Sequence, residues 1–131
     1  MCRVKKFEPI TIQPLQRIIA FVVGIAKYEV YQELKNPVRD SKAITDLLEA
    51  QNVEVFYVSD CGVKEFEEKF TSFEAAIKPG DTAFLYFAGH AVEFENSLRL
   101  IAKSNSSTKN IEADSLNLDK LLARSIARDP H

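Results

Sequence analysis

The sequence has few of the residues that build covalently or metal-stabilised domains. Its two cysteines, Cys2 and Cys61, lie far apart and lack the paired spacing of a zinc site. They support neither a disulfide framework nor a metal cage. Only four glycines are present, and they form no glycine-rich phosphate loop. Acids do not cluster at the ends of predicted strands either, which argues against a flavodoxin-like binding domain or a receiver domain.

Positive charge and long apolar runs are also scarce. Lysine and arginine number 17 against 19 acids, with a formal net charge of -2, and both signs are interspersed. No basic stripe is available for nucleic acid or an anionic membrane. The longest apolar run, around 18–24, is far shorter than the roughly 20 residues that cross a bilayer, and the N-terminus lacks a signal-peptide layout. We therefore expect a cytoplasmic protein that contacts neither nucleic acid nor membrane.

What is present is the composition of an ordinary globular domain. Hydrophobic residues make up 46% and charged residues 27% of the 131 positions, which suits one compact domain with one core. Residues 1–16 contain Pro9 and Pro14 but no sustained period, and we interpret them as a leader or an edge segment. The folded domain is expected over 17–131.

Apolar periodicity predicts alternating strands and helices. The expected strands are 18–23, 53–58, 82–87 and a short one at 98–102, and the expected helices are 37–51, 66–77 and 118–126. Such alternation favours an α/β fold with an open, mostly parallel sheet, helices on both faces and flavodoxin-like order. No strand follows the last helix, so we expect the sheet to be incomplete at its C-terminal side.

Catalytic groups in open parallel sheets gather beyond the carboxyl ends of the strands. Here the corresponding loops are 24–36, 59–62 and 88–96. The third contains His90, the only histidine inside the chain. A lone loop histidine is often just a solvated surface residue. However, small Ala88 and Gly89 before it would let another group approach the imidazole, as a base paired with a nucleophile requires.

The stretch Leu85-Tyr86-Phe87-Ala88-Gly89-His90 resembles the histidine motif of the caspase-like cysteine peptidases, especially paracaspases and bacterial orthocaspases. Three further stretches agree in order and spacing: 21–28 resembles the first strand of this clan, 34–40 the start of its first helix, and 77–81 the lead into its histidine strand. The resemblance covers 17 to about 128. It implies a caspase-like fold and the large-subunit (p20-like) portion of such a domain.

By this resemblance His90 is the base of a Cys-His dyad, which takes the thiol proton and later protonates the leaving amine. Asp40 matches the acid that lines the pocket for the substrate residue before the cut in paracaspases and metacaspases, where a carboxylate selects Arg or Lys. Gly89 joins His90 as a catalytic candidate, and Ala88 joins Asp40 as a substrate-binding one. Ala91 replaces a family glycine whose N–H helps hold the oxyanion; alanine keeps the N–H but disfavours positive φ.

Other interpretations of these residues stay open. Asp40 is also the kind of acid that the helix dipole favours in a first turn, by about 0.3 to 1 kcal/mol. Cys61 invites pairing with His90, but the nucleophile of the family follows the last helix in an Asp-x-Cys context, so we interpret Cys61 as a turn residue with an ordinary thiol. A second departure from the family is 100–105, where a Pro and an Asp are usual.

Acidic residues late in the chain suggest a comparison with metacaspases, which are known to depend on calcium. The acids in question are Glu93, Glu95, Glu112 and Asp114. Their spacing fits no calcium loop. We therefore expect neither a metal site nor a cofactor.

The leading hypothesis is the histidine-bearing part of a caspase-like cysteine endopeptidase that cleaves peptide or protein substrates after Arg or Lys and is inactive as this segment alone. Its partners would be the substrate and the remaining C-terminal (p10-like) segment or chain. An open sheet edge predicts self-association or a partner that supplies a strand. The alternative is a non-catalytic caspase-like module, a pseudoenzyme for assembly or regulation, which Ala91 and the missing nucleophile suggest.

Overall fold

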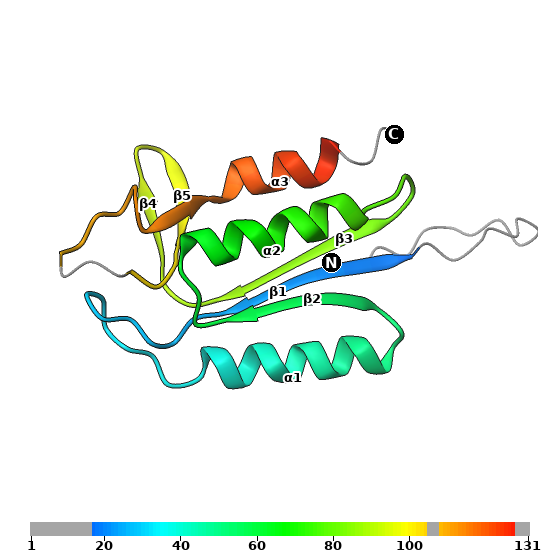
Figure 1. Cartoon of the computed structure of the whole chain (residues 1–131), viewed down its shortest axis with the longest axis horizontal. Helices are drawn as coiled ribbons and strands as arrows, with labels where there is room; N and C mark the ends of the chain where they lie inside the picture. The colour runs from blue at the N-terminus through cyan, green and yellow to red at the C-terminus, as the bar shows by residue number, and fades with distance from the viewer. Residues whose placement is uncertain (1–16, 105–107, 128–131) are drawn as a thin grey trace, which may run out of the picture.

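A three-stranded parallel sheet forms the centre of the molecule, with helices on both faces (Figure 1). The computed structural model describes residues 17–104 and 108–127, so the predicted leader at 1–16 lies outside it. In chain order the elements are β1 (Ile18–Gly24), α1 (Pro37–Ala50), β2 (Glu54–Ser59), α2 (Val63–Ala76), β3 (Thr82–Ala88), β4 (Ala91–Phe94), β5 (Ser97–Ile101), β6 (Ser115–Asn117) and α3 (Leu118–Ala127). The sheet order β2-β1-β3 confirms the predicted fold class.

The central strand β1 is buried on both faces. It pairs in parallel with β2 and β3, so that Phe21 lies between Phe56 and Leu85. Every residue of β1 after Ile18 is buried, as its continuous apolar sequence predicts. Because β1 fixes the register of both neighbours, the carboxyl ends of all three strands lie at the same end of the molecule (Figure 1).

An aromatic cluster joins β1 to α2. The ring of Phe21 lies 5.1 to 5.5 Å from the rings of Phe66, Phe70 and Phe73. These three phenylalanines are buried and recur at helical spacing, which confirms the predicted apolar face of this helix. Their tilted and edge-on arrangement adds stabilisation to the burial of their area.

On the opposite face of the sheet, the first turn of α1 packs directly against the end of β1. A Cβ on Gly24 would lie 2.1 Å from the Ser41 Oγ and 2.5 Å from the Pro37 carbonyl oxygen. Pro37 occupies the predicted first position of the helix. Asparagine before a helix is a usual side-chain cap. The Asn36 side chain makes no capping hydrogen bond, however, and Asn36 instead accepts the Asp40 N–H through its main-chain oxygen.

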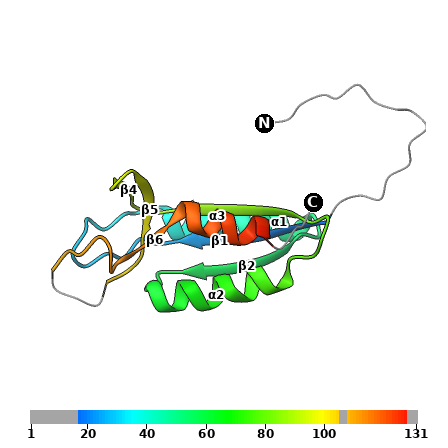
Figure 2. The same cartoon turned by 90° about the horizontal axis from the view of Figure 1, so that it is seen from above.

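A second, antiparallel sheet follows β3, in the order β4-β5-β6. Figure 2 shows it at the end of the molecule where the parallel strands finish. The expectation that 88–96 is entirely loop was therefore wrong, since 91–94 form β4. The hairpin turns at Glu95 and Asn96, both with positive φ, as two-residue turns require. The pair lacks the glycine that usually signals such a turn in a sequence.

The last helix begins at a side-chain cap. Asn117 Oδ1 accepts the Lys120 N–H at 3.1 Å, so Asn117 is the cap of this helix. Ser115, two residues earlier, belongs to β6. The cap sets where α3 starts beside the small sheet.

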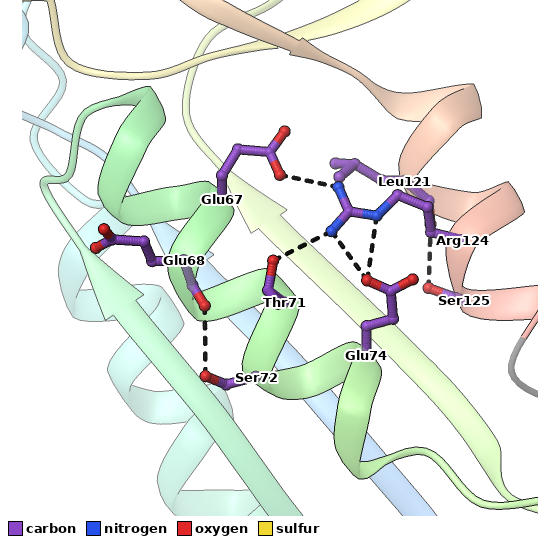
Figure 3. A network of polar contacts seen from close by, with 8 residues as sticks. All are labelled: Glu67, Glu68, Thr71, Ser72, Glu74, Leu121, Arg124 and Ser125. Carbon is purple, nitrogen blue, oxygen red and sulfur yellow. Dashed lines mark hydrogen bonds and ion pairs between the residues drawn. The ribbon is translucent and has the colours of Figure 1, made fainter.

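Polar contacts hold α3 to α2 (Figure 3). The Arg124 guanidinium lies 2.8 Å from Glu67 and 2.9 Å from Glu74, and it covers the Phe70 ring at 4.7 Å. The arginine therefore joins two helices through both charge and packing. Among the described residues, no helix is long and apolar enough to cross a membrane.

The strand β3 forms one edge of the parallel sheet, since within the described ranges it pairs only with β1. Two apolar cavities of about 320 and 310 Å³ lie beside it under α3. Phe84 of this strand and Leu122 of α3 remain partly exposed. Apolar surface is thus left uncovered along this edge of the sheet.

Candidate functional site

His90 lies where the chain leaves the parallel sheet and enters the antiparallel one. Gly24 pairs with Ala88, and the Ile25 N–H donates to the Ala88 oxygen at 2.9 Å. His90 follows two residues later, and β4 begins at the next residue. The predicted location beyond the carboxyl end of a parallel strand is confirmed for this residue.

Tyr28 holds the main chain at His90. The His90 N–H donates to the Tyr28 hydroxyl at 2.9 Å, and that hydroxyl donates to the Ile101 carbonyl oxygen at 2.9 Å. The two rings lie 4.6 Å apart. Tyr28 is buried, and burial raises its pKa to about 12. The hydroxyl therefore stays protonated and remains a donor at ordinary pH.

The imidazole of His90 is oriented by a main-chain oxygen. Its Nε2 lies 2.7 Å from the Gln32 carbonyl oxygen. A carbonyl oxygen only accepts, so Nε2 must carry the hydrogen of the neutral ring. Nδ1 then has the free lone pair, which is the state that a general base requires.

Ala88 and Gly89 were expected to leave space beside the imidazole. In the structure the space at Gly89 is filled by the protein itself. A Cβ on Gly89 would lie 2.6 Å from the Tyr28 hydroxyl and 2.8 Å from the Phe87 ring. Glycine at this position makes room for the tyrosine contact, whereas Ala88 ends β3 and remains partly exposed.

The backbone of Ala91 keeps a donor available. Ala91 is not among the residues with positive φ, so alanine fits where the resemblance expects glycine. The Ile101 N–H donates to the His90 oxygen, which makes Ala91 and Leu100 a pair that exchanges no hydrogen bonds with each other. The Ala91 N–H therefore points away from β5, and β4 is an edge strand of the small sheet.

Asp40 lies in the first turn of α1 with its side chain 54% exposed. Because this turn packs on Gly24, Asp40 belongs to the same end of the sheet as His90. Within the described part of the chain, Asp40 forms an ion pair with Arg39, whose Nε is 3.9 Å away. Such an exposed pair is weak, so the carboxylate is free to meet a cationic ligand.

Comparison with known families gives this site its context. The caspase domain family matches residues 17–127, which is most of the chain. The chain belongs to the caspase domain family. This is a family of caspase-like cysteine peptidases, so protein substrates are the expected ligands. A search of curated proteins finds no match to the chain.

In this caspase domain, Cys61 does not contribute to the site. Its side chain is 1% exposed and belongs to the core. Burial raises its pKa to about 12, so the reactive thiolate is scarce at neutral pH. The expectation of an ordinary thiol at Cys61 was therefore wrong, whereas the burial agrees with the prediction that Cys61 is not paired with His90.

The late acids do not assemble a metal site in the caspase domain. Asp114 is buried and accepts the Asn110 N–H, while Glu93, Glu95 and Glu112 are exposed. Across 17–104 and 108–127, no three histidine, cysteine or acidic side chains group closely enough to bind a metal. These four acids therefore do not come together as calcium ligands.

Two contributors to the site were missed by sequence reasoning. Gln32 acts through its carbonyl oxygen, which every residue has, so no side-chain signal marks it. Tyr28 lies at the end of the stretch that resembles the first strand of the family, and its place in that stretch was the available signal. Its contact with His90 spans 62 positions, which local patterns do not reveal.

Proposed function

We propose that this chain is the histidine-bearing, p20-like part of a cysteine endopeptidase of the paracaspase, orthocaspase or metacaspase type. It would cleave after Arg or Lys and be inactive as this segment alone. One observation carries the proposal: Gln32 holds the Nε2 hydrogen of His90, leaving Nδ1 as a base beside the outward Ala91 N–H. Location in the cytoplasm belongs to the same proposal.

The chemistry follows from these positions. Nδ1 of His90 takes the proton of a cysteine thiol, and the thiolate attacks the scissile carbonyl carbon. The Ala91 N–H donates to the resulting oxyanion. When the C–N bond breaks, the imidazolium returns the proton to the leaving amine, and water then releases the acyl group from sulfur. No cofactor enters any step.

The cysteine would come from a p10-like segment or chain. The edge of β3 supports this part of the proposal, because a further strand can pair there and fill the cavities beside it. Until that edge is paired, it favours self-association as well. Both the strand and the dimer would cover the apolar surface under α3.

Asp40 would select the substrate. Its exposed carboxylate stands at the same end of the sheet as His90. A charge-assisted hydrogen bond from an arginine or lysine side chain would outweigh the weak contact with Arg39. An acidic side chain before the cut would be repelled.

The test is cleavage of fluorogenic peptides with Arg, Lys or Asp before the scissile bond, by the longest natural form of the protein. We expect cleavage after Arg or Lys, abolished in His90→Ala and reduced in Asp40→Asn with an increased KM. Thermal unfolding of both variants controls for folding. Cleavage that survives His90→Ala would contradict the proposal.

Ala91 favours a second candidate, a non-catalytic caspase-like module. Alanine is tolerated there by the backbone, but its methyl group stands where the family has only hydrogen. A well-folded full-length protein that cleaves none of the peptides, with a cysteine present after α3, would favour this pseudoenzyme. Assembly with a partner would then be its function.

A further inference from the structure

The Tyr28 hydroxyl occupies the place of a main-chain hydrogen bond. His90 and Ile101 stand opposite each other at the position where an antiparallel pair exchanges two bonds. One of the two is present, from the Ile101 N–H to the His90 oxygen at 2.9 Å. The other is replaced by two bonds of 2.9 Å through the Tyr28 hydroxyl.

This insertion has a mechanical consequence. A direct bond would bring the His90 nitrogen to about 2.9 Å from the Ile101 oxygen, whereas the hydroxyl holds them further apart. The chain thus opens where it passes from one sheet to the other. The imidazole on this opened segment then reaches the Gln32 oxygen.

The surroundings are built for the hydroxyl. Gly89 has no Cβ where the oxygen of Tyr28 lies. The Tyr28 ring is buried in the core that also contains Ile101, so the phenol has little freedom to move. Burial keeps the phenol protonated, so it donates to Ile101 and accepts from His90 at the same time.

The geometry points to Tyr28 as a positioning residue: its hydroxyl sets the backbone of His90 and thereby the orientation and tautomer of the imidazole. Calling the imidazole a base rests on the proposed function, whereas the positioning itself does not. Removing the hydroxyl with Tyr28→Phe would let the His90–Ile101 pair close, and the ring would move away from Gln32.

Imidazole ¹⁵N spectra of the whole chain test this directly and need no peptidase activity. The unaltered protein should show one neutral tautomer of His90, with hydrogen on Nε2. Tyr28→Phe should lose that single tautomer, because the ring moves away from the Gln32 oxygen. An unchanged His90 signature in folded Tyr28→Phe would overturn the inference.

Tyr31→Phe is the matched control. The Tyr31 ring lies 6.4 Å from that of His90, but its buried hydroxyl has no hydrogen-bond partner within the described part of the chain. The same atom is removed near the same ring, so the spectrum of His90 should stay as in the unaltered chain. Equal changes in both variants would also overturn the inference.

Two further measurements separate the remaining outcomes. If Tyr28→Phe does not fold, the unaltered chain decides: a contact between the Tyr28 hydroxyl proton and the His90 amide proton supports the inference, and its absence overturns it. In the cleaving full-length form, Tyr28→Phe should lower kcat about 10- to 100-fold with little change in KM. If the unaltered protein cleaves nothing, the proposed function fails while the spectra still judge Tyr28.

Discussion

At the scale of single residues, two asparagines precede helices but only one uses its side chain. Asn117 caps α3 through its Oδ1, whereas Asn36 makes no side-chain cap. Both sequences show an asparagine before a helix, so the pattern alone does not separate them. The difference depends on backbone angles, because Asn36 is already in the helical region at φ -109° and ψ -11°.

Replacing the two asparagines should therefore have unequal effects. We expect Asn117→Ala to lower the free energy of unfolding by about 0.5 to 2 kcal/mol, because the Lys120 N–H loses its acceptor. Asn36→Ala should cost much less. Urea unfolding of both variants measures the difference, and equal losses would contradict it.

The buried thiol of Cys61 makes stability depend on pH. Its pKa is raised to about 12 in the folded protein from an ordinary value near 9.0. The stability is constant below the unfolded pKa and falls as pH rises from there toward the folded pKa, because only the unfolded chain ionises.

Between pH 9 and 10 the thiol should account for a loss of about 1 kcal/mol. Cys61→Ala should flatten this part of the curve, whatever the cost of the cavity at neutral pH. Chemical denaturation at several pH values gives both slopes. If the free energy of unfolding falls with the same slope in both proteins, the fold does not protect the Cys61 thiol from ionisation.

At the scale of elements, the parallel strands and their helices were predictable because each is long and strongly patterned. The hairpin formed by β4 and β5 was not predictable. β4 spans four residues and β6 spans three, so neither has room for a period, and the Glu95–Asn96 turn lacks glycine. His90 was found from its place after a parallel strand and from the resemblance, and the role of Ala91 from the resemblance alone. The oxygen of Gln32 required the folded loop.

The contact between α2 and α3 depends on Arg124 (Figure 3). Arg124→Ala should lower the free energy of unfolding by about 1 to 2 kcal/mol, because both the partly exposed ion pairs and the packing on Phe70 are lost. Arg39→Ala is the control, since that exposed arginine has only a 3.9 Å contact. Thermal or urea unfolding compares them, and a near-zero effect of Arg124→Ala would contradict this role.

At the scale of the whole molecule, the β3 edge should govern association. We expect the chain to form dimers at high concentration, and Phe84→Lys on β3 to weaken them, because a charged edge strand resists pairing. Leu47→Lys on α1 tests whether general apolar exposure is the cause, since Leu47 is more exposed than Phe84. Sedimentation equilibrium measures both. Dimers that only Leu47→Lys disrupts would place the interface elsewhere.

One glycine links the two halves of the proposed site. Gly24 pairs with Ala88, two positions before His90, and its missing side chain also seats the turn that contains Asp40. The positions of the proposed base, His90, and of the proposed pocket acid, Asp40, therefore both depend on Gly24. A substituent at Gly24 would displace one relative to the other, so that substrate choice and cleavage rate would deteriorate together rather than separately.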